Sequence, residues 1–246
     1  MKVMVVNYNP QYYNEDRQIG DRCFFDGKDV YIDFNADLKS FEVTPGKIDA
    51  DYAPGTGSSG LDLYSVDADP MELTTEFYVG GPSPEAVQTN ISNMLLAARQ
   101  CVIRKEGDIF EYAAVLTDRD SEDTEVEPYY LLSLKFAVIR RKPLVTHQIQ
   151  QTAVIHNEGN VASGARISLS PETEMDSVTV MGITVMDLEP GITYVIDGIT
   201  GRVTANGINY FGHTDLIEFP KMQPGENEIE VSESIPVTVS FYPVFS

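Results

Sequence analysis

The chain has 246 residues, of which 42% are hydrophobic and 22% charged, and its formal net charge at pH 7 is −21. This composition is typical of a globular protein with one large or two modest domains and argues against extended disorder. The acidic balance argues against duplex DNA as a bound ligand, because binding phosphates needs clustered Lys and Arg. No apolar run approaches the roughly 20 residues of a membrane-spanning helix, so we expect a soluble chain made in the cytoplasm.

The only two cysteines, Cys23 and Cys101, both lie in apolar, strand-like stretches. In a cytosolic setting this pattern favours buried free thiols, and a disulfide between them is the alternative. Asp26-Gly27 follows the first stretch and indicates a hairpin turn. The rest of residues 1–40 shows no clear period.

Residues 51–60 are rich in Gly and Ser and predict a loop between strands, with a strand beginning at Leu61. A phosphate-binding loop is the sharper alternative, but no Lys follows the glycines and no strand-then-helix frame surrounds them. Gly57-Ser58-Ser59-Gly60 is the nearest approach to a serine-nucleophile motif. It lacks the strand-turn-helix setting that exposes such a nucleophile.

Met71 to Val79 alternates apolar and polar residues and predicts a half-buried strand. A helix is expected next, with Ser83 as N-cap, Pro84 at the first helical position and Glu85 near the positive end of the helix dipole. Its predicted buried face comprises Val87, Ile91, Met94, Leu95 and Ala98.

Two further strands are predicted, Ile109 to Leu116 and Tyr130 to Ile139, the second with alternate apolar residues. The strongly acidic run from Asp118 to Pro128 between them predicts a solvated loop. A calcium site is the alternative, because the run holds closely spaced carboxylates at Asp118, Asp120, Glu122 and Asp123. The run lacks the mid-loop Gly and the terminal bidentate Glu of an EF-hand loop.

The segment from Arg140 to Gln151 has no apolar period and contains Pro143, so we place a domain boundary here, with domains 1–148 and 149–246. The second domain shows no helical period, and short strand-like runs recur between turns, as expected of a β-sandwich. The runs are Thr152 to Ile155, Arg166 to Leu169, Ser177 to Val180, Thr184 to Met186, Tyr194 to Ile196, Arg202 to Thr204 and Glu226 to Val231. The turns are Asp197-Gly198, Asn206-Gly207 and Pro224-Gly225, where each Gly is expected to supply a positive φ.

The three histidines, His147, His156 and His213, show no metal-ligand spacing and have no Cys nearby, so we expect surface or linker residues. The abundant Asp and Glu could supply a glycosidase pair, but spacing in the sequence does not reveal their separation in the fold. We therefore predict no catalytic residue, no cofactor-binding residue and no metal ligand, and a protein that is not an enzyme.

Several motifs resemble the distal tail proteins of long-tailed (siphovirus-type) bacteriophages and related prophage tails. The C-terminal motifs are Val195-Ile196-Asp197-Gly198, Gly201-Arg202-Val203, Gly207-Ile208-Asn209, Phe219-Pro220, Pro224-Gly225-Glu226-Asn227 and Val237-Thr238-Val239. The N-terminal motifs are Pro54-Gly55 with Gly60-Leu61-Asp62-Leu63, and Leu73 to Gly81 with the helix that follows. The resemblance implies a mainly β chain, with an N-terminal split β-barrel carrying one packed helix, like a tail-tube domain, and a C-terminal galectin-like β-sandwich.

The resemblance further implies a structural component of a phage tail tip. Six copies would form a ring that joins the tail tube to the baseplate, tail-fibre or receptor-binding proteins and leaves a channel for DNA, which passes without specific binding. The implied location is the virion tail tip, after synthesis in the bacterial cytoplasm, with no membrane partner. The alternative is a monomeric carbohydrate-binding or adhesin-type β-sandwich protein, and a glycoside hydrolase is a more remote one.

Overall fold

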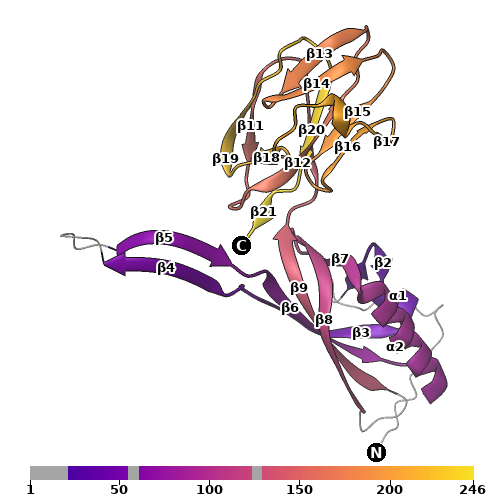
Figure 1. Ribbon diagram of the computed structural model, residues 1–246. Coiled ribbons are helices and arrows are strands. Elements are labelled where there is room, and N and C mark those ends of the chain that lie inside the picture. Colours follow the sequence, from indigo (N-terminus) through magenta and orange to yellow (C-terminus); the bar gives the residue numbers. More distant parts are fainter. Residues whose placement is uncertain (1–21, 55–60, 124–128) are drawn as a thin grey trace, which may run out of the picture. The chain divides into compact units, whose positions relative to one another are not determined.

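The computed structural model describes residues 22–54, 61–123 and 129–246; for 48–54, 61–68 and 123 it describes the backbone only. The fold is mainly β and antiparallel, as predicted (Figure 1). Contacts divide the chain into two compact units, Met1–Arg140 and Arg141–Phe245. This division falls eight residues before the boundary expected from the sequence, which was placed between residues 148 and 149.

In its described residues, the first unit contains one large sheet, a separate hairpin and two helices. The large sheet has the strand order β2-β1-β7-β8-β9-β6-β3. Its strands are β1 (Cys23–Phe25), β2 (Lys28–Asp29), β3 (Ala36–Thr44), β6 (Met71–Val79), β7 (Gln100–Lys105), β8 (Glu111–Asp123) and β9 (Tyr130–Arg141). The hairpin pairs β4 (Ile48–Pro54) with β5 (Leu61–Ala68), and the helices are α1 (Val30–Phe34) and α2 (Pro84–Ala98).

Helix α2 begins as its sequence predicts. The Ser83 Oγ accepts a hydrogen bond from the Ala86 N–H at 3.2 Å, and Pro84 occupies the first turn. Four of the five predicted apolar positions are buried, and Leu95 is half-buried against the same core. The predicted hairpin at Asp26-Gly27 also forms, with φ of 50° and 80°, and joins β1 to β2.

The core of the first unit lies between the large sheet and α2. Phe25 meets Phe77 and Phe136 edge-on, with ring centroids 6.1 Å apart in both pairs. Phe41 on β3 meets Tyr112 on β8 at 5.5 Å, although β3 and β8 are not neighbours in the strand order. The sheet is therefore strongly curved, and its last strand returns over the core.

Two segments of this unit that the sequence predicts as loops are partly strands. Asp51 to Pro54 belongs to β4, since the alternation that begins at Ile48 continues into the Gly-rich run. Asp118 to Asp123 extends β8, because β9 runs alongside and supplies backbone partners, while residues 118–122 are exposed. The remainder of both predicted loops, 55–60 and 124–128, lies outside the described residues.

The second unit has one large sheet of order β10-β20-β12-β15-β16-β17, with β18 paired to β12, and two smaller two-stranded sheets, β11-β19 and β13-β14. The large sheet contains β10 (Val145–Ile149), β12 (Ser163–Leu169), β15 (Tyr194–Asp197), β16 (Arg202–Ala205), β17 (Ile208–Asn209), β18 (Lys221–Met222) and β20 (Val237–Phe241). The other elements are β11 (Ala153–Asn157), β13 (Met175–Val180), β14 (Ile183–Leu188), η1 (Phe211–His213), β19 (Gly225–Ile229) and β21 (Val244–Phe245).

Every strand predicted from residue 152 onward forms, and its ends coincide with the predicted ones or shift by at most three residues. Buried side chains from the large sheet and from both smaller sheets belong to one hydrophobic cluster, so the smaller sheets cover one face of the large one. The sequence predicts an irregular segment from His147 to Gln151, and this prediction is wrong in part. The first three residues of the segment belong to β10, which pairs with β20. β10 lies at the edge of the sheet and pairs with one strand. This position explains why its sequence shows little alternation of apolar and polar residues.

The predicted turns of the second unit divide into two kinds. Asn206 and Gly207 have φ of 48° and 83° and join β16 to β17 as expected, and Gly225 has a φ of 85°. Gly198 does not have a positive φ, which corrects the prediction, and the positive φ of this turn falls on Gly201. A Cβ on Gly198 would lie 2.4 Å from the Pro220 oxygen and 2.8 Å from the Ala165 oxygen, so close packing of backbone requires this glycine.

Candidate assembly surfaces

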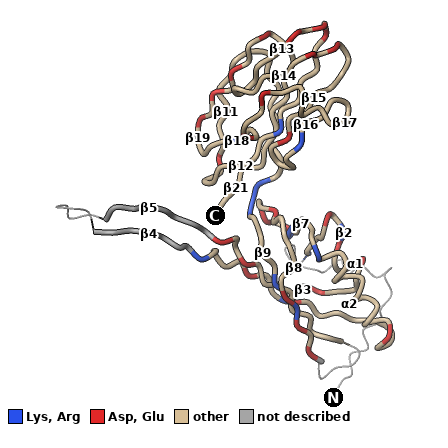
Figure 2. The backbone as a smooth tube through the Cα atoms, in the orientation of Figure 1, with Lys and Arg blue, Asp and Glu red and all other residues tan. Residues whose placement is uncertain are grey.

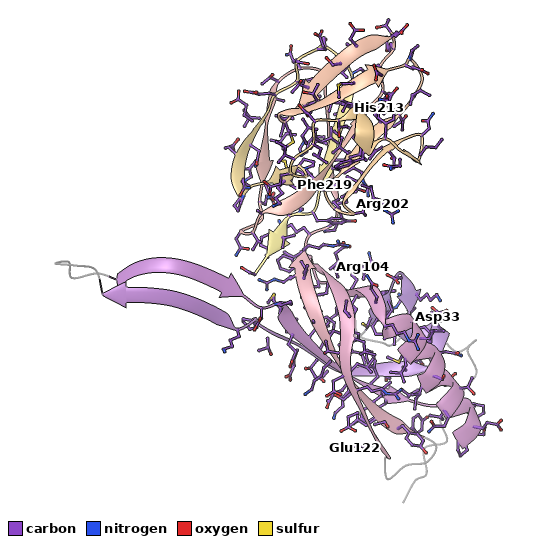
Figure 3. All side chains as sticks on the ribbon, in the orientation of Figure 1. Asp33, Arg104, Glu122, Arg202, His213 and Phe219 are labelled. Carbon is purple, nitrogen blue, oxygen red and sulfur yellow. The ribbon has the colours of Figure 1, made fainter. Side chains whose placement is uncertain are left out.

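The three histidines lie on separate elements. His147 is on β10 and stacks near Phe241, with ring centroids 6.2 Å apart. The His156 Nδ1 lies 3.0 Å from Glu226 Oε1 at the surface. The His213 Nδ1 lies 3.0 Å from Asp187 Oδ2, and His213 is also at the surface (Figure 3). Across the described ranges, no group of three or more His, Cys, Asp or Glu side chains is placed to hold a metal ion.

Both cysteines are buried and free, as predicted. Burial raises the pKa of each thiol to about 12. Since the thiolate is the reactive form of cysteine, these side chains act as core residues at neutral pH.

The carboxylate of the motif residue Asp197 is buried and held by hydrogen bonds from two directions. Its Oδ2 accepts from Arg166 Nε at 3.0 Å and Nη2 at 2.8 Å, and its Oδ1 accepts from the backbone N–H groups of Ile199 and Thr200 at 2.9 and 3.2 Å. Burial favours a raised pKa for Asp197, but the hydrogen bonds from Arg166, Thr200 and Ile199 outweigh it and lower the pKa. The motif therefore fixes a turn between β15 and β16.

Asn227, in the second turn motif, also has a structural role. Its side chain accepts from the Gln223 N–H at 2.8 Å and donates to the carbonyls of Gln223 and Gly225 at 2.8 and 2.9 Å. These bonds close the turn that leads into β19. Both motifs therefore stabilise the scaffold.

A cleft of about 610 Å³ lies at one edge of the second unit. Neutral polar side chains line most of it, namely Gln148, Gln150, Gln151, Ser234 and Thr238, with Ile149, Pro236 and Val237. The lining has no aromatic ring on which a sugar could stack and no ionisable side chain that could catalyse hydrolysis.

The first unit exposes an apolar area on the outward face of its large sheet. Val115 on β8 is 50% exposed and Ile139 on β9 is 51% exposed. Their neighbours along each strand, such as Ala114 and Val138, are buried in the core. Large apolar side chains on an open sheet face are typical of interaction surfaces.

The second unit exposes apolar side chains around η1. Ile208, Phe211 and Ile217 are exposed, and Met186 lies close by, because the Tyr210 hydroxyl donates to the carbonyls of Met186 and Asp187 at 3.0 and 2.8 Å. His213 stacks on Tyr210 with centroids 4.4 Å apart. Sequence reasoning missed both apolar surfaces, because their members have the same residue types as the core.

Charge is distributed over both units, with acidic residues more numerous than basic ones (Figure 2). The acidic residues of β8 stand along an extended strand that ends beyond Glu122 (Figure 3), a geometry that spreads carboxylates apart instead of gathering them around an ion. None of the described helices combines the length and the apolar character needed to cross a membrane.

Comparison with solved structures finds a similar fold in components of phage tail hubs and baseplates. The chain is similar to the crystal structure of the SPP1 Dit (gp 19.1) protein, described as a paradigm of the hub adsorption apparatus in phages that infect Gram-positive hosts. The TM-score is 0.68 at 14% identity, over 92% of this chain and 99% of the other. It is also similar to a chain of the phage P2 baseplate in its activated conformation with Ca, with a TM-score of 0.57 at 10% identity over 92% of this chain and 98% of the other. For the phage p2 baseplate in its activated conformation with Sr, the TM-score is 0.51 at 11% identity over 84% of this chain and 90% of the other.

No family model matches the sequence. No curated protein matches it either. At these identities the solved structures establish a shared fold, and the fold extends over both units.

Proposed function

We propose that the chain is a distal tail protein, a structural hub of a phage tail tip or of a related prophage tail. Six copies form a ring that joins the tail tube to the baseplate or receptor-binding apparatus. The single observation that carries this proposal is the similarity of fold to the SPP1 hub protein over 92% of the chain. A match of this extent includes both units. A lone β-sandwich adhesin would need only the second unit.

In the proposed domain organisation, the first unit is the ring-forming, tail-tube-like barrel with its packed helix, and the second is the galectin-like sandwich. The curvature of the first sheet supports the barrel, since Phe41 on its last strand contacts Tyr112 across the core. The covering of one large sheet by two smaller ones supports the sandwich. The proposed location is the tail tip of a virion.

The acidic charge fits a DNA channel. Each chain contributes −21, so a ring of six has six times that charge. Any part of it that faces the lumen repels phosphate, and DNA then slides through without being bound. A basic channel wall in the assembled ring would contradict this part of the proposal.

The two assembly surfaces and the structural roles of Asp197 and Asn227 support a non-enzymatic protein. A monomeric glycan-binding protein is the competing function. Light scattering together with a glycan-binding assay separates the two. A particle of six times the 27.3 kDa chain mass with no glycan binding supports the hub, whereas a monomer that binds glycans contradicts it.

A further inference from the structure

The second unit carries its few basic residues on one of its sheets. After Lys142 the unit has 13 acidic residues and only three basic ones, Arg166, Arg202 and Lys221 (Figure 2). All three basic residues lie on strands of the large sheet, which contain a single acid, Asp197. The strands of the two smaller sheets contain four acidic residues and no Lys or Arg. Charges of opposite sign are therefore separated between the two sides of the second unit.

The register places the basic residues on the outward face of this large sheet, which the smaller sheets do not cover. Arg166 on β12 pairs with Asp197 on β15, and Asp197 pairs with Arg202 on β16. Directly paired residues share a face of a sheet, and successive residues of a strand alternate between its faces. The next residues along the three strands belong to the buried core, namely Ile167, Ile196 and Val203. Lys221 pairs with Gly164, two residues before Arg166, and so lies on the outward face as well.

Arg202 gives this outward face its positive charge. The Asp197 carboxylate is engaged by Arg166, whose Nε and Nη2 both donate to Asp197 Oδ2. Lys221 forms an ion pair with Glu218. Arg202 is exposed (Figure 3), and among the described residues it has no ion-pair partner. Three basic side chains thus stand against two acidic ones, in a chain whose net charge is −21.

The rest of the outward face carries hydroxyl and amide groups. One row of paired residues crosses all six strands from β10 to β17 and comprises Gln148, Thr238, Ser168, Val195, Thr204 and Asn209. Thr146 and Ser240 are also paired, and their hydroxyl oxygens lie 3.1 Å apart. A surface of this composition suits a polar contact with hydrogen bonds and complementary charges more than a hydrophobic one.

The opposite side of the second unit presents an acidic sheet face. On β11–β19 the residues of the inner face are buried, as Ile155 and Ile229 show. The alternate residues face away from the core and are exposed, namely Val154, His156, Glu226 and Glu228. Within the β11–β19 and β13–β14 strands no Lys or Arg offsets these carboxylates. The outward face of β11–β19 therefore complements the outward face of the large sheet in charge.

We propose that the outward face of the large sheet of one second unit binds the outward face of β11–β19 of a second copy, with Arg202 opposite Glu226 and Glu228. This inference rests on the proposed ring. In a ring each chain meets its two neighbours through two different surfaces, so the contact is heterologous. Opposite charges on two sides of one unit meet this requirement, whereas two acidic faces would repel each other.

Charge reversal with rescue tests the contact. Light scattering of the full chain gives the concentration at which half of the protein is assembled. Arg202→Glu and Glu228→Lys are each expected to raise this concentration about tenfold, because each brings like charges together. The chain with both changes is expected to return to within about twofold of the wild type, since the two charges are then exchanged across the contact. Asp176→Lys, the same charge change at an exposed acid of β13, is the matched control and is expected to have no effect.

The outcomes separate this contact from the hub proposal. If the wild type assembles but neither single change differs from Asp176→Lys, or the double change does not recover, the contact is wrong and the hub proposal stands. If the wild type is a single chain at every concentration, both are contradicted. Added salt is expected to reduce the difference between Arg202→Glu and the wild type, because it screens exposed charges. A difference that salt leaves unchanged would contradict an electrostatic contact.

Discussion

At the scale of single residues, Asp197 shows how a sequence motif can have a structural reason. Its carboxylate satisfies two backbone N–H groups of the turn and pairs with Arg166 on the adjacent strand. We expect Asp197→Ala to lower the free energy of unfolding by about 2 kcal/mol, because it leaves Arg166 and the turn without their acceptor. Chemical denaturation measures this loss, with Asp176→Ala, an exposed acid on β13, as the control. Equal effects of the two changes would contradict the role given to Asp197.

The same carboxylate predicts a pH dependence. Its folded pKa lies below the ordinary value of 3.8, so its stabilising contribution is complete above that pH and is lost as the pH falls through the folded pKa. The difference in unfolding free energy between the wild type and Asp197→Asn is therefore expected to shrink as the pH falls below 3.8. A difference that stays constant down to the acid transition would show that the charge of Asp197 contributes nothing.

Gly198 makes a second residue-scale prediction. A Cβ there would meet the carbonyl oxygens of Pro220 and Ala165, and backbone atoms cannot move aside as a flexible side chain can. We expect Gly198→Ala to cost about 3 kcal/mol, at the upper end of overpacking effects. Gly212→Ala is the control, because its Cβ would meet nothing within 4 Å and its φ is not positive. Thermal unfolding of both variants checks the prediction, which fails if Gly198→Ala unfolds with the wild type.

At the scale of elements, the Ser83 hydroxyl caps the first turn of helix α2. The Ser83 Oγ accepts a hydrogen bond from the Ala86 N–H. We therefore expect Ser83→Ala to lower the unfolding free energy by about 1 kcal/mol. Ser92→Ala is the matched control, since Ser92 is exposed within the same helix and alanine there is at least as favourable for helix formation. Denaturant midpoints of the two variants measure the difference, and a destabilised Ser92→Ala with an unchanged Ser83→Ala would contradict it.

Elements whose apolar residues recur at a clear helical or strand period could be predicted from the sequence. Elements that bury few side chains could not. The strand Met71–Val79 and the helix Pro84–Ala98 each bury one complete face, so their periods are clear. The strand Val145–Ile149 escaped prediction because it lies at a sheet edge and no residue in it is fully buried. Asp118–Asp123 escaped because its strand conformation depends on the neighbouring β9 and not on its own exposed side chains.

The two exposed apolar surfaces could not be predicted from the sequence for a different reason. Val115 and Val138 are the same residue type on neighbouring strands, yet one is half exposed and the other buried. Only the pairing of strands and the position of the core decide which alternate residues face outward. The sequence predicts no catalytic residue from spacing alone. In the described residues, the motif side chains Asp197 and Asn227 have structural roles.

At the scale of the whole molecule, the net charge of −21 predicts how the protein behaves toward DNA. We expect the assembled protein not to retard duplex DNA in a mobility-shift assay at low salt, where screening is weakest and electrostatic binding would be most visible. A retarded band that disappears as salt is added would reveal a cationic surface and contradict the proposed repelling channel.

The proposed function depends above all on the hexameric ring. The curved sheet of the first unit and its exposed apolar side chains are expected to bring six copies together around an open centre. Electron microscopy of the purified full chain tests this most directly. We predict ring-shaped particles with sixfold symmetry and a central channel, and compact particles without a channel, or rings of another symmetry, would contradict the hub.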